Sequence, residues 1–125
     1  MKKLIALFLL TAGLAQAQST IKLFEALQAA EIEDVIEGKV TTTKSIGGLT
    51  CTKDQEQNVE CSMDLFTKNA PLLYENLNVY ETETNNGSET GLRETTKQVD
   101  NLMCTKTTIV SSGEVYFANC DLLKF

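Results

Sequence analysis

TTKSIGGLTCTK, which spans residues 42–53, matches TTKQVDNLMCTK, which spans residues 95–106, without a gap. Each stretch is followed by a second cysteine, Cys61 or Cys120, and then by an Asp-Leu pair. A self-match at a fixed spacing is typical of internal duplication, in which each copy is one unit of supersecondary structure. The sequence therefore predicts two halves with the same backbone plan and equivalent disulfides.

Each half is predicted to begin with a helix. Apolar residues recur at helical spacing after a Ser19 or Thr20 cap in the first half, and after Asn69-Ala70-Pro71 in the second half. In the first half a helix that continues to Ile36 is an alternative to a strand. The strand-like pattern of residues 79–84 in the second half favours the strand.

Strands and turns follow the helix in each half. Alternating or β-branched stretches predict four strands, over residues 31–36, 39–46, 79–84 and 92–99. Two-residue turns of the kind that accept positive φ at both positions, Gly47-Gly48 and Asp100-Asn101, then lead into a hairpin that holds the two cysteines of each half. Each half is therefore predicted as one helix followed by a four-stranded antiparallel meander.

These units predict an α+β fold, a tandem duplication of a helix plus four-stranded antiparallel meander with one intra-repeat disulfide in each copy. Repeat 1 is predicted to span residues 18–66 and repeat 2 residues 67–125. A chain of 125 residues has room for one hydrophobic core. The two repeats are therefore expected to form one small domain together.

The four cysteines allow three disulfide pairings. Equivalent halves favour Cys51 with Cys61 and Cys104 with Cys120, and each pair brackets turn-forming residues, so that its members would face each other across adjacent strands. Gly113 can take the positive φ of a three-residue hairpin loop inside the second pair. A metal site is disfavoured, because the chain has no histidine and its cysteines lack the short paired spacing of zinc ligands.

The N-terminal segment, residues 1–17, has the pattern of a cleaved bacterial signal peptide: two lysines, an apolar run and Ala15-Gln16-Ala17 before the cleavage site. Cleavage would leave 9 basic and 17 acidic residues, a net charge of −8. This acidity disfavours binding to nucleic acid or to anionic membranes, which attract clustered Lys and Arg. It suits solubility or a basic partner, and the leader predicts a periplasmic or secreted protein without a membrane anchor.

One face of the second predicted hairpin is apolar where the first hairpin is polar. A register drawn through the cysteines pairs Ile109 with Val115 and Thr107 with Phe117. It creates an apolar strip opposite the disulfide, made of Met103, Ile109, Val115 and Phe117. If exposed, this strip is a candidate protein-binding face. The alternative is that it packs against the other half or a neighbouring helix.

Composition disfavours catalysis, since the chain has no histidine and disulfide bonding removes nucleophilic thiolates. Two carboxylate pairs remain, Glu31 with Glu33 and Glu81 with Glu83. On a strand each pair shares a face and could serve glycosidic acid–base chemistry or bind calcium. No calcium-loop pattern or glycine-rich cradle accompanies them, so a solvated strand face is the favoured interpretation, and neither an enzymatic activity nor a cofactor is expected.

The sequence therefore favours an exported, non-enzymatic binding protein that docks on another extracytoplasmic protein through its second half or the cleft between halves. The predicted architecture is similar to that of the β-lactamase inhibitor proteins, which also pair two helix-plus-meander units with a disulfide in each. This similarity implies an inhibitor as one subclass; no motif is shared, and fold alone does not convey function. A structural or stress-related envelope protein is the alternative, and a small hydrolase that uses the glutamate pairs is less favoured.

Overall fold

The computed structural model describes residues 20–123, so the predicted leader at residues 1–17 lies outside the described residues. The described chain forms two four-stranded antiparallel sheets, each a meander in which neighbours in sequence are neighbours in space. The first sheet consists of β1 (Glu31–Ile36), β2 (Lys39–Ile46), β3 (Leu49–Lys53) and β4 (Val59–Met63). The second consists of β5 (Thr82–Asn85), β6 (Leu92–Val99), β7 (Leu102–Ile109) and β8 (Val115–Leu122).

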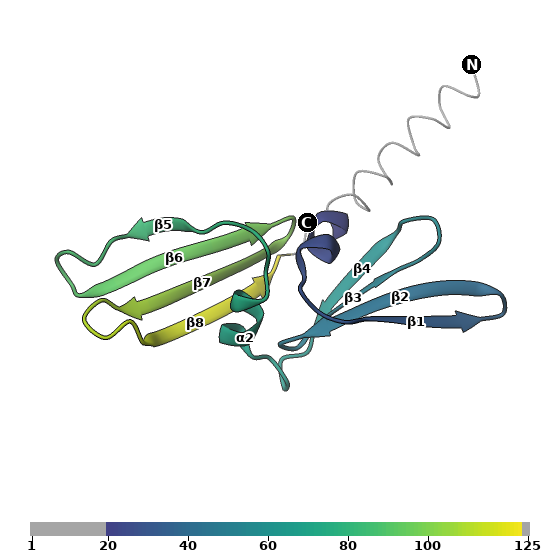
Figure 1. Ribbon diagram of the computed structural model, residues 1–125, viewed down its shortest axis with the longest axis horizontal. Helices are drawn as coiled ribbons and strands as arrows, with labels where there is room; N and C mark the ends of the chain where they lie inside the picture. Colours follow the sequence, from purple (N-terminus) through teal and green to yellow (C-terminus); the bar gives the residue numbers. More distant parts are fainter. Residues whose placement is uncertain (1–19, 124–125) are drawn as a thin grey trace, which may run out of the picture.

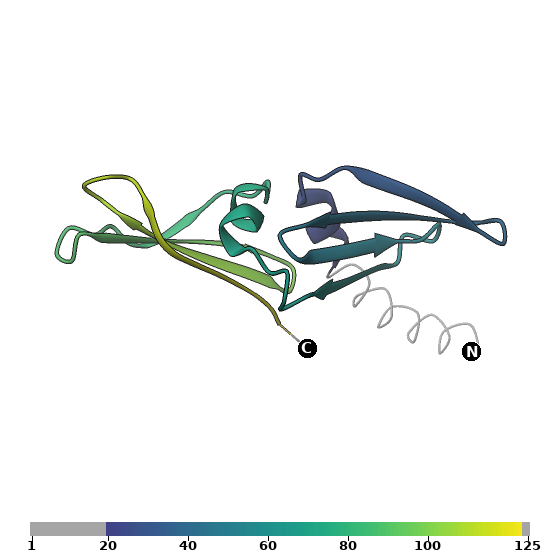
Figure 2. The same cartoon turned by 90° about the horizontal axis from the view of Figure 1, so that it is seen from below.

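The two sheets lie end to end, and the two helices meet between them (Figure 1). A helix at residues 20–26 accompanies the first sheet and α2 (Ala70–Glu75) accompanies the second. Both helices lie on the same side of the sheets (Figure 2). The start of α2 agrees with the prediction, because the Asn69 side chain accepts a hydrogen bond from the Leu72 N–H and Pro71 occupies the first turn. Each half is thus a four-stranded antiparallel sheet with one helix.

The predicted turns are observed with one difference. Gly47 and Gly48 have φ values of 60° and 88°, and the connection between β1 and β2 has positive φ at Glu37 and Gly38. These left-handed conformations fit two-residue hairpin turns. In the corresponding turn of the second half, Asp100 has a φ of 52°, whereas Asn101 is not among the described residues with positive φ. The expectation of positive φ at both positions is therefore wrong for that turn.

Two strand predictions need correction. The strand predicted from Val79 begins only at Thr82, because the preceding residues join the other half through the hydrogen bond from the Asn78 N–H to the Ala26 carbonyl. The predicted pairing of Ile109 with Val115 is also wrong, since Val115 pairs with Thr108. A register shift at this point, with one extra residue in β8, is a β-bulge.

The predicted disulfides are confirmed. Cys51 is bonded to Cys61, and these residues are direct partners in the register of β3 and β4. Cys104 is bonded to Cys120, which are likewise direct partners in β7 and β8. Each bond therefore ties two neighbouring strands within one half.

The buried residues of both halves form a single hydrophobic cluster. At its centre the ends of the two helices pair through a bridge between Leu27 and Leu77. The Gln28 N–H donates to the Asn76 carbonyl at 2.8 Å, and the Asn78 N–H donates to the Ala26 carbonyl at 2.7 Å. The backbone is therefore paired directly between the halves.

A second set of contacts crosses between the halves at the helix starts. The Asn69 N–H donates to the Gly47 carbonyl at 2.9 Å, so the β2–β3 turn supports α2. In return, the Leu23 N–H donates to Oδ2 of Asp100 at 2.7 Å, so the β6–β7 turn caps the helix of the first half. A Cβ at Gly47 would lie 2.8 Å from Leu73 Cβ, which leaves no room for a side chain there. Each turn thus holds the helix of the other half.

Candidate functional sites

The helix-covered face of the first sheet holds an aromatic ring between two lysines. The Nζ atoms of Lys44 and Lys53 lie 4.6 Å and 4.8 Å from the centroid of the Phe24 ring. The Lys44 Nζ also donates a hydrogen bond of 2.9 Å to the Phe24 carbonyl, near the end of the helix at residues 20–26. The two cations therefore stabilise the ring and the helix end.

The second half repeats this arrangement. The Nζ atoms of Lys97 and Lys106 each lie 4.6 Å from the centroid of the Tyr74 ring. Lys97 also donates to the carbonyls of Tyr74 and Leu77, at 2.8 Å and 3.1 Å. All four lysines come from the matched sequence stretches. We conclude that the repeated lysines fasten a helix to a sheet in each half, which is a structural role.

The hydroxyl of Tyr74 gives the second half a polar network that Phe24 does not provide. It donates to Oε2 of Glu81 at 2.5 Å and lies 2.7 Å from Oγ1 of Thr95. Burial, with a further contribution from the Glu81 carboxylate, raises the pKa of Tyr74 above its ordinary value. The hydrogen bond from Tyr74 lowers the pKa of Glu81, and the charges of Lys106 and Lys97 act in the same direction. Glu81 is thus held in its ionised form.

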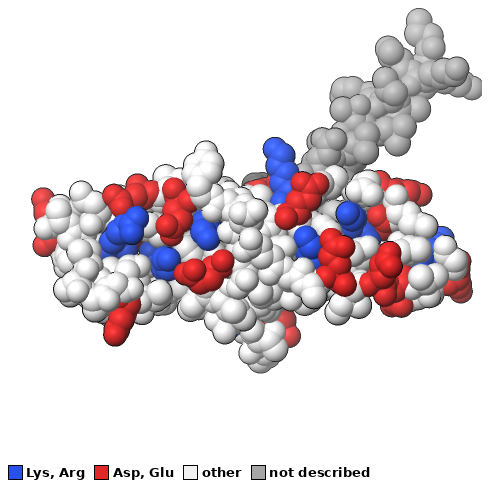
Figure 3. All heavy atoms as spheres, in the orientation of Figure 1, with Lys and Arg blue, Asp and Glu red and all other residues white. Residues whose placement is uncertain are grey.

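Three of the four carboxylates in the predicted pairs lie near basic groups. Glu81 lies 3.6 Å from Nζ of Lys106, and no ion pair is observed for Glu33 within the described residues. The Glu83 carboxylate lies 2.6 Å from Nε of Arg93, and Glu31 lies 4.0 Å from Nζ of Lys44. On the side of the molecule shown in Figure 3, acidic and basic side chains alternate over both sheets. A general acid at neutral pH needs a raised pKa, and the shift at Glu81 is in the opposite direction.

Residues 20–123 contain no group of three or more His, Cys, Asp or Glu side chains placed to hold a metal ion. In the same segment, every helix is too short or too polar to cross a membrane. Disulfides form and persist in oxidising compartments, which is consistent with an extracellular or periplasmic protein.

The outer end of the β7–β8 hairpin exposes large apolar side chains. We call this group the hairpin patch; its members, with their exposed fractions, are Val110 (54%), Val115 (44%), Tyr116 (66%) and Phe117 (59%). The hairpin is well fastened, because the Ile109 N–H donates to the Glu114 carbonyl and the Gly113 N–H donates back to the Ile109 carbonyl, both at 2.8 Å. Gly113 has the predicted positive φ, at 74°, but the predicted three-residue loop is wrong, because residues 110–114 connect β7 to β8.

The structure divides the predicted apolar strip. Phe117 is exposed, whereas Met103 and Ile109 are half-buried. Phe117 pairs with Thr107, four residues from Met103 along β7, which corresponds to about 13 Å. The bulge in β8 also moves Val115 into register with Thr108, and so to the opposite face from Ile109. Phe117 pairs with Thr107, which shares a face with Ile109, so Val115 and Phe117 lie on opposite faces and the hairpin patch covers both faces of the hairpin end.

The corresponding hairpin of the first half ends in a polar loop. The Asp54 carboxylate accepts hydrogen bonds of 2.9 Å from the backbone N–H groups of Glu56 and Asn58. The bond from the Asn58 N–H is the main reason that the pKa of Asp54 is lowered. The loop at residues 54–58 carries no apolar side chain, so the hairpin patch has no counterpart at this position of the first half.

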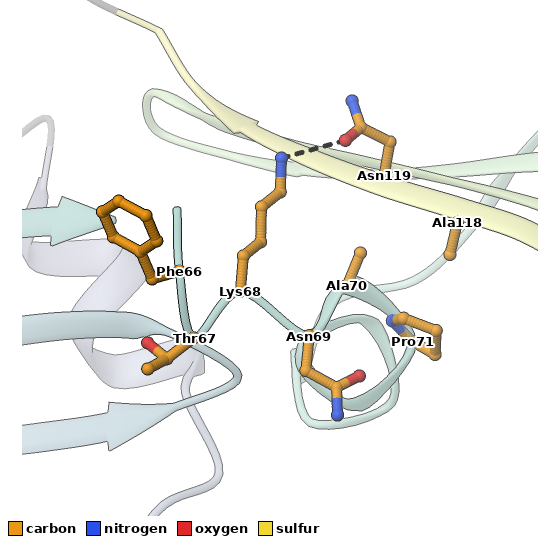
Figure 4. A pocket seen from close by; sticks show the side chains of 8 residues that line it. All are labelled: Phe66, Thr67, Lys68, Asn69, Ala70, Pro71, Ala118 and Asn119. Carbon is orange, nitrogen blue, oxygen red and sulfur yellow. Dashed lines mark hydrogen bonds between the residues drawn. The ribbon is translucent and has the colours of Figure 1, made fainter. Parts of the chain in front are cut away.

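The segment between the halves also exposes apolar residues. Leu65 and Phe66 are 76% and 100% exposed. Phe66 stands at one end of an open pocket of about 470 Å³ between this segment, α2 and β8 (Figure 4). Lys68 spans the pocket and donates to Oδ1 of Asn119 at 2.9 Å. The sequence analysis did not identify Leu65 and Phe66 as a candidate site, because two apolar residues after a strand are usually buried in the core.

The face of the second sheet that is opposite α2 carries a hollow of about 730 Å³. We call it the outer hollow; it is lined by Asn78, Val79, Tyr80, Thr82, Thr84, Thr96, Gln98 and Met103. Cys104 is buried on the helix side, so its neighbour Met103 points to the other face of the sheet. Met103 is the one member of the predicted strip in this hollow.

Comparisons of the chain with protein-family models, with curated proteins and with solved structures found no significant match. The function therefore has to be inferred from the side chains themselves.

Proposed function

We propose that this is an exported, non-enzymatic binding protein that docks on another extracytoplasmic protein through the hairpin patch. One observation carries the proposal: the end of one hairpin carries four large apolar side chains, on both of its faces, and each is more than two-fifths exposed. They are Val110, Val115, Tyr116 and Phe117. Aromatic side chains are enriched in protein interfaces, and tyrosine is one of the residue types that contribute most of the binding energy there.

The patch is held in place before any partner binds. The Val110 N–H donates to the Gly91 carbonyl at 2.9 Å, and the Gly91 N–H donates to the Gly87 carbonyl at 2.8 Å. The β5–β6 loop therefore braces the β7–β8 hairpin from the side. Such preorganisation reduces the entropy that binding would otherwise cost.

The chemistry of the patch indicates the kind of partner. It consists of two valines, a tyrosine and a phenylalanine on both faces of the hairpin end, which fit an apolar groove that encloses this end and offers a hydrogen-bond acceptor or donor to the Tyr116 hydroxyl. The net charge of the chain, −6, favours a partner whose surface around this groove is basic. An inhibitor of an extracytoplasmic enzyme is one member of this class.

The proposal includes the origin and location of the protein. We take the two halves, repeat 1 at residues 18–66 and repeat 2 at residues 67–125, as the products of a tandem duplication that together form one domain. The matched stretches and the repeated lysine–ring–lysine arrangement support this view. The leader pattern and the two disulfides support a periplasmic or secreted location.

Site-specific photo-crosslinking tests the docking proposal. A photoreactive amino acid is placed at Phe117 and, in a matched control, at Val35, which has a similar exposed fraction of 64% on the first sheet. We expect a discrete adduct in the native envelope from position 117 only. Phe117→Asp should then abolish copurification of the protein found in that adduct, while the circular dichroism spectrum stays native.

Two results would contradict the proposal. One is equal crosslinking from both positions, which indicates nonspecific contact of exposed apolar side chains. The other is unfolding of the Phe117→Asp variant, which would place Phe117 in the interior. A structural envelope protein without a specific partner predicts no discrete adduct from either position.

A further inference from the structure

We infer that the outer hollow of the second sheet is a binding subsite for a neutral saccharide. The inference goes beyond docking through the hairpin patch, because the two regions lie at different ends of β7. Met103 belongs to the hollow and Thr107 pairs with Phe117 of the patch, four residues further along the strand.

The hollow has the size and shape of a small-ligand site. Its volume of about 730 Å³ falls in the range of such sites, about 300–1,000 Å³. Strands β5, β6 and β7 form the floor, and the segment that carries Asn78, Val79 and Tyr80 forms one wall. The wall is anchored by the hydrogen bond from the Asn78 N–H to the Ala26 carbonyl, so it does not depend on a ligand for its position.

The lining carries no charge. Charged residues make up 22% of the chain, yet none of the eight lining residues is Asp, Glu, Lys or Arg. Two carboxylates share this face with the hollow. Asp121, the register partner of Met103, is engaged by Lys68 at 3.6 Å and by the Asn119 amide at 2.8 Å, whereas Glu94, two residues from Thr96 along β6, is exposed. An uncharged ligand is therefore favoured over a phosphate, a carboxylate or a basic peptide.

Among the polar side chains that line the hollow, Thr84 uses its hydroxyl within the sheet, where it donates to the Glu94 carbonyl at 3.3 Å. In the described part of the chain, the side chains of Asn78, Tyr80, Thr82, Thr96 and Gln98 make no hydrogen bond with the protein. Amide and hydroxyl side chains offer donors and acceptors together, and so do the vicinal hydroxyl groups of a sugar. This pairing identifies a polyhydroxylated ligand.

An aromatic platform completes the site. Tyr80 is 90% exposed, whereas tyrosine side chains in folded proteins are typically intermediate in burial. Its ring presents an apolar surface against which the C–H face of a pyranose can pack, while the hydroxyl remains in water. Met103 adds a second apolar contact on the floor. A ring with one apolar face and several hydroxyl groups is the ligand that matches both surfaces.

Titration of the isotope-labelled protein with three oligosaccharides tests the inference by NMR. The probes are the trimers of N-acetylglucosamine, glucose and galacturonic acid, each added up to about 10 mM, which saturates a site of millimolar affinity. We expect shift changes centred on Tyr80, Thr96 and Gln98 with at least one neutral trimer. The arm that responds distinguishes an amino-sugar glycan strand from a plain glucan, and the charged trimer should bind more weakly.

Two variants make the test specific. Tyr80→Ala should lower the affinity for the responding trimer about tenfold, whereas Tyr116→Ala, which removes another exposed tyrosine, should leave it unchanged. The inference is overturned if no neutral trimer causes a shift, if the shifts lie outside the hollow, or if Tyr80→Ala binds as well as the unaltered protein. Because Tyr80 lies outside the hairpin patch, these results are independent of the docking test.

Discussion

The two halves share their internal supports and differ at their outer surfaces. Both have the same strand order, a disulfide between the third and fourth strands, and an aromatic ring between two lysines. The β3–β4 connection is a polar loop ordered by Asp54, whereas the β7–β8 hairpin presents Tyr116 and Phe117 to solvent. The shared features therefore support the fold of both halves, and the hairpin ends are free to differ.

The same contrast holds on the outer faces of the sheets. In the first half, hydroxyl side chains on this face bond one another, as in Thr43 with Thr52 and Ser45 with Thr50. In the second half, Thr96 and Gln98 face the outer hollow without such partners. Polar groups that are paired within the sheet stabilise it, and those that are not are free to bind a ligand.

The largest effect on stability is expected from removal of the two aromatic rings that lie between lysines, those of Phe24 and Tyr74. Phe24→Ala and Tyr74→Ala should each lower the free energy of unfolding by about 3–5 kcal/mol, because each deletes a buried aromatic side chain. Urea titrations followed by circular dichroism measure both values. An exposed ring serves as the control, and Tyr116→Ala should change the value by less than about 0.5 kcal/mol. If only one of the two substitutions lowered the free energy of unfolding by this much, the two rings would not have equivalent roles in the two halves.

Removal of the disulfides should have the next largest effect. Cys51→Ala/Cys61→Ala and Cys104→Ala/Cys120→Ala should each cost about 3 kcal/mol, because the unfolded chain gains the freedom of an open loop. The bonded residues are 10 and 16 positions apart. The second pair should therefore cost about 0.4 kcal/mol more than the first. The urea midpoints of the two variants test this order, and a clearly larger cost for the first pair would contradict it.

A smaller, pH-dependent effect should separate Glu81 from its counterpart Glu31. The folded pKa of Glu81 is lowered, so its contribution to stability is present above pH 4.5 and is lost as the pH falls through the folded value. Glu81→Gln should therefore destabilise the protein at pH 7, and its difference from the unaltered protein should shrink as the pH falls below 4.5. Glu31→Gln is the matched control and should destabilise the protein less at pH 7, because Phe24 has no hydroxyl to donate. Thermal melts over a series of pH values measure both effects, and equal destabilisation by the two variants at pH 7 would contradict the distinction.

The sequence predicted most of the fold because the decisive signals are local and repeated. Gly47-Gly48 fixes a two-residue turn, and the repeat fixes the pairing of Cys51 with Cys61 and its counterpart. The late start of β5 was not predictable, since contact with Ala26 in the other half overrides the β-branched pattern. The bulge near Val115 had a visible signal, because three consecutive apolar residues, Val115-Tyr116-Phe117, cannot keep a period of two.

The candidate sites were less accessible to sequence reasoning. The four residues of the predicted strip were assigned to one surface, which required an unbroken register from Cys104 to the end of the hairpin. One inserted residue in β8 separated Val115 from Ile109. The outer hollow was not predicted, because its wall is formed by residues 78–80 ahead of β5, where the sequence pattern predicted a strand from Val79.

In each half, a turn of the other half holds the start of the helix, and this limits how the chain can be cut into separate fragments. Gly47 holds the start of α2, and Asp100 caps the helix that contains Leu23. Either half on its own would lose the group that holds its helix start and would uncover its share of the common hydrophobic cluster. Proteolytic nicking at the exposed Leu65-Phe66 would therefore leave two fragments that remain associated and complement each other, as the subunits of an obligate heterodimer do.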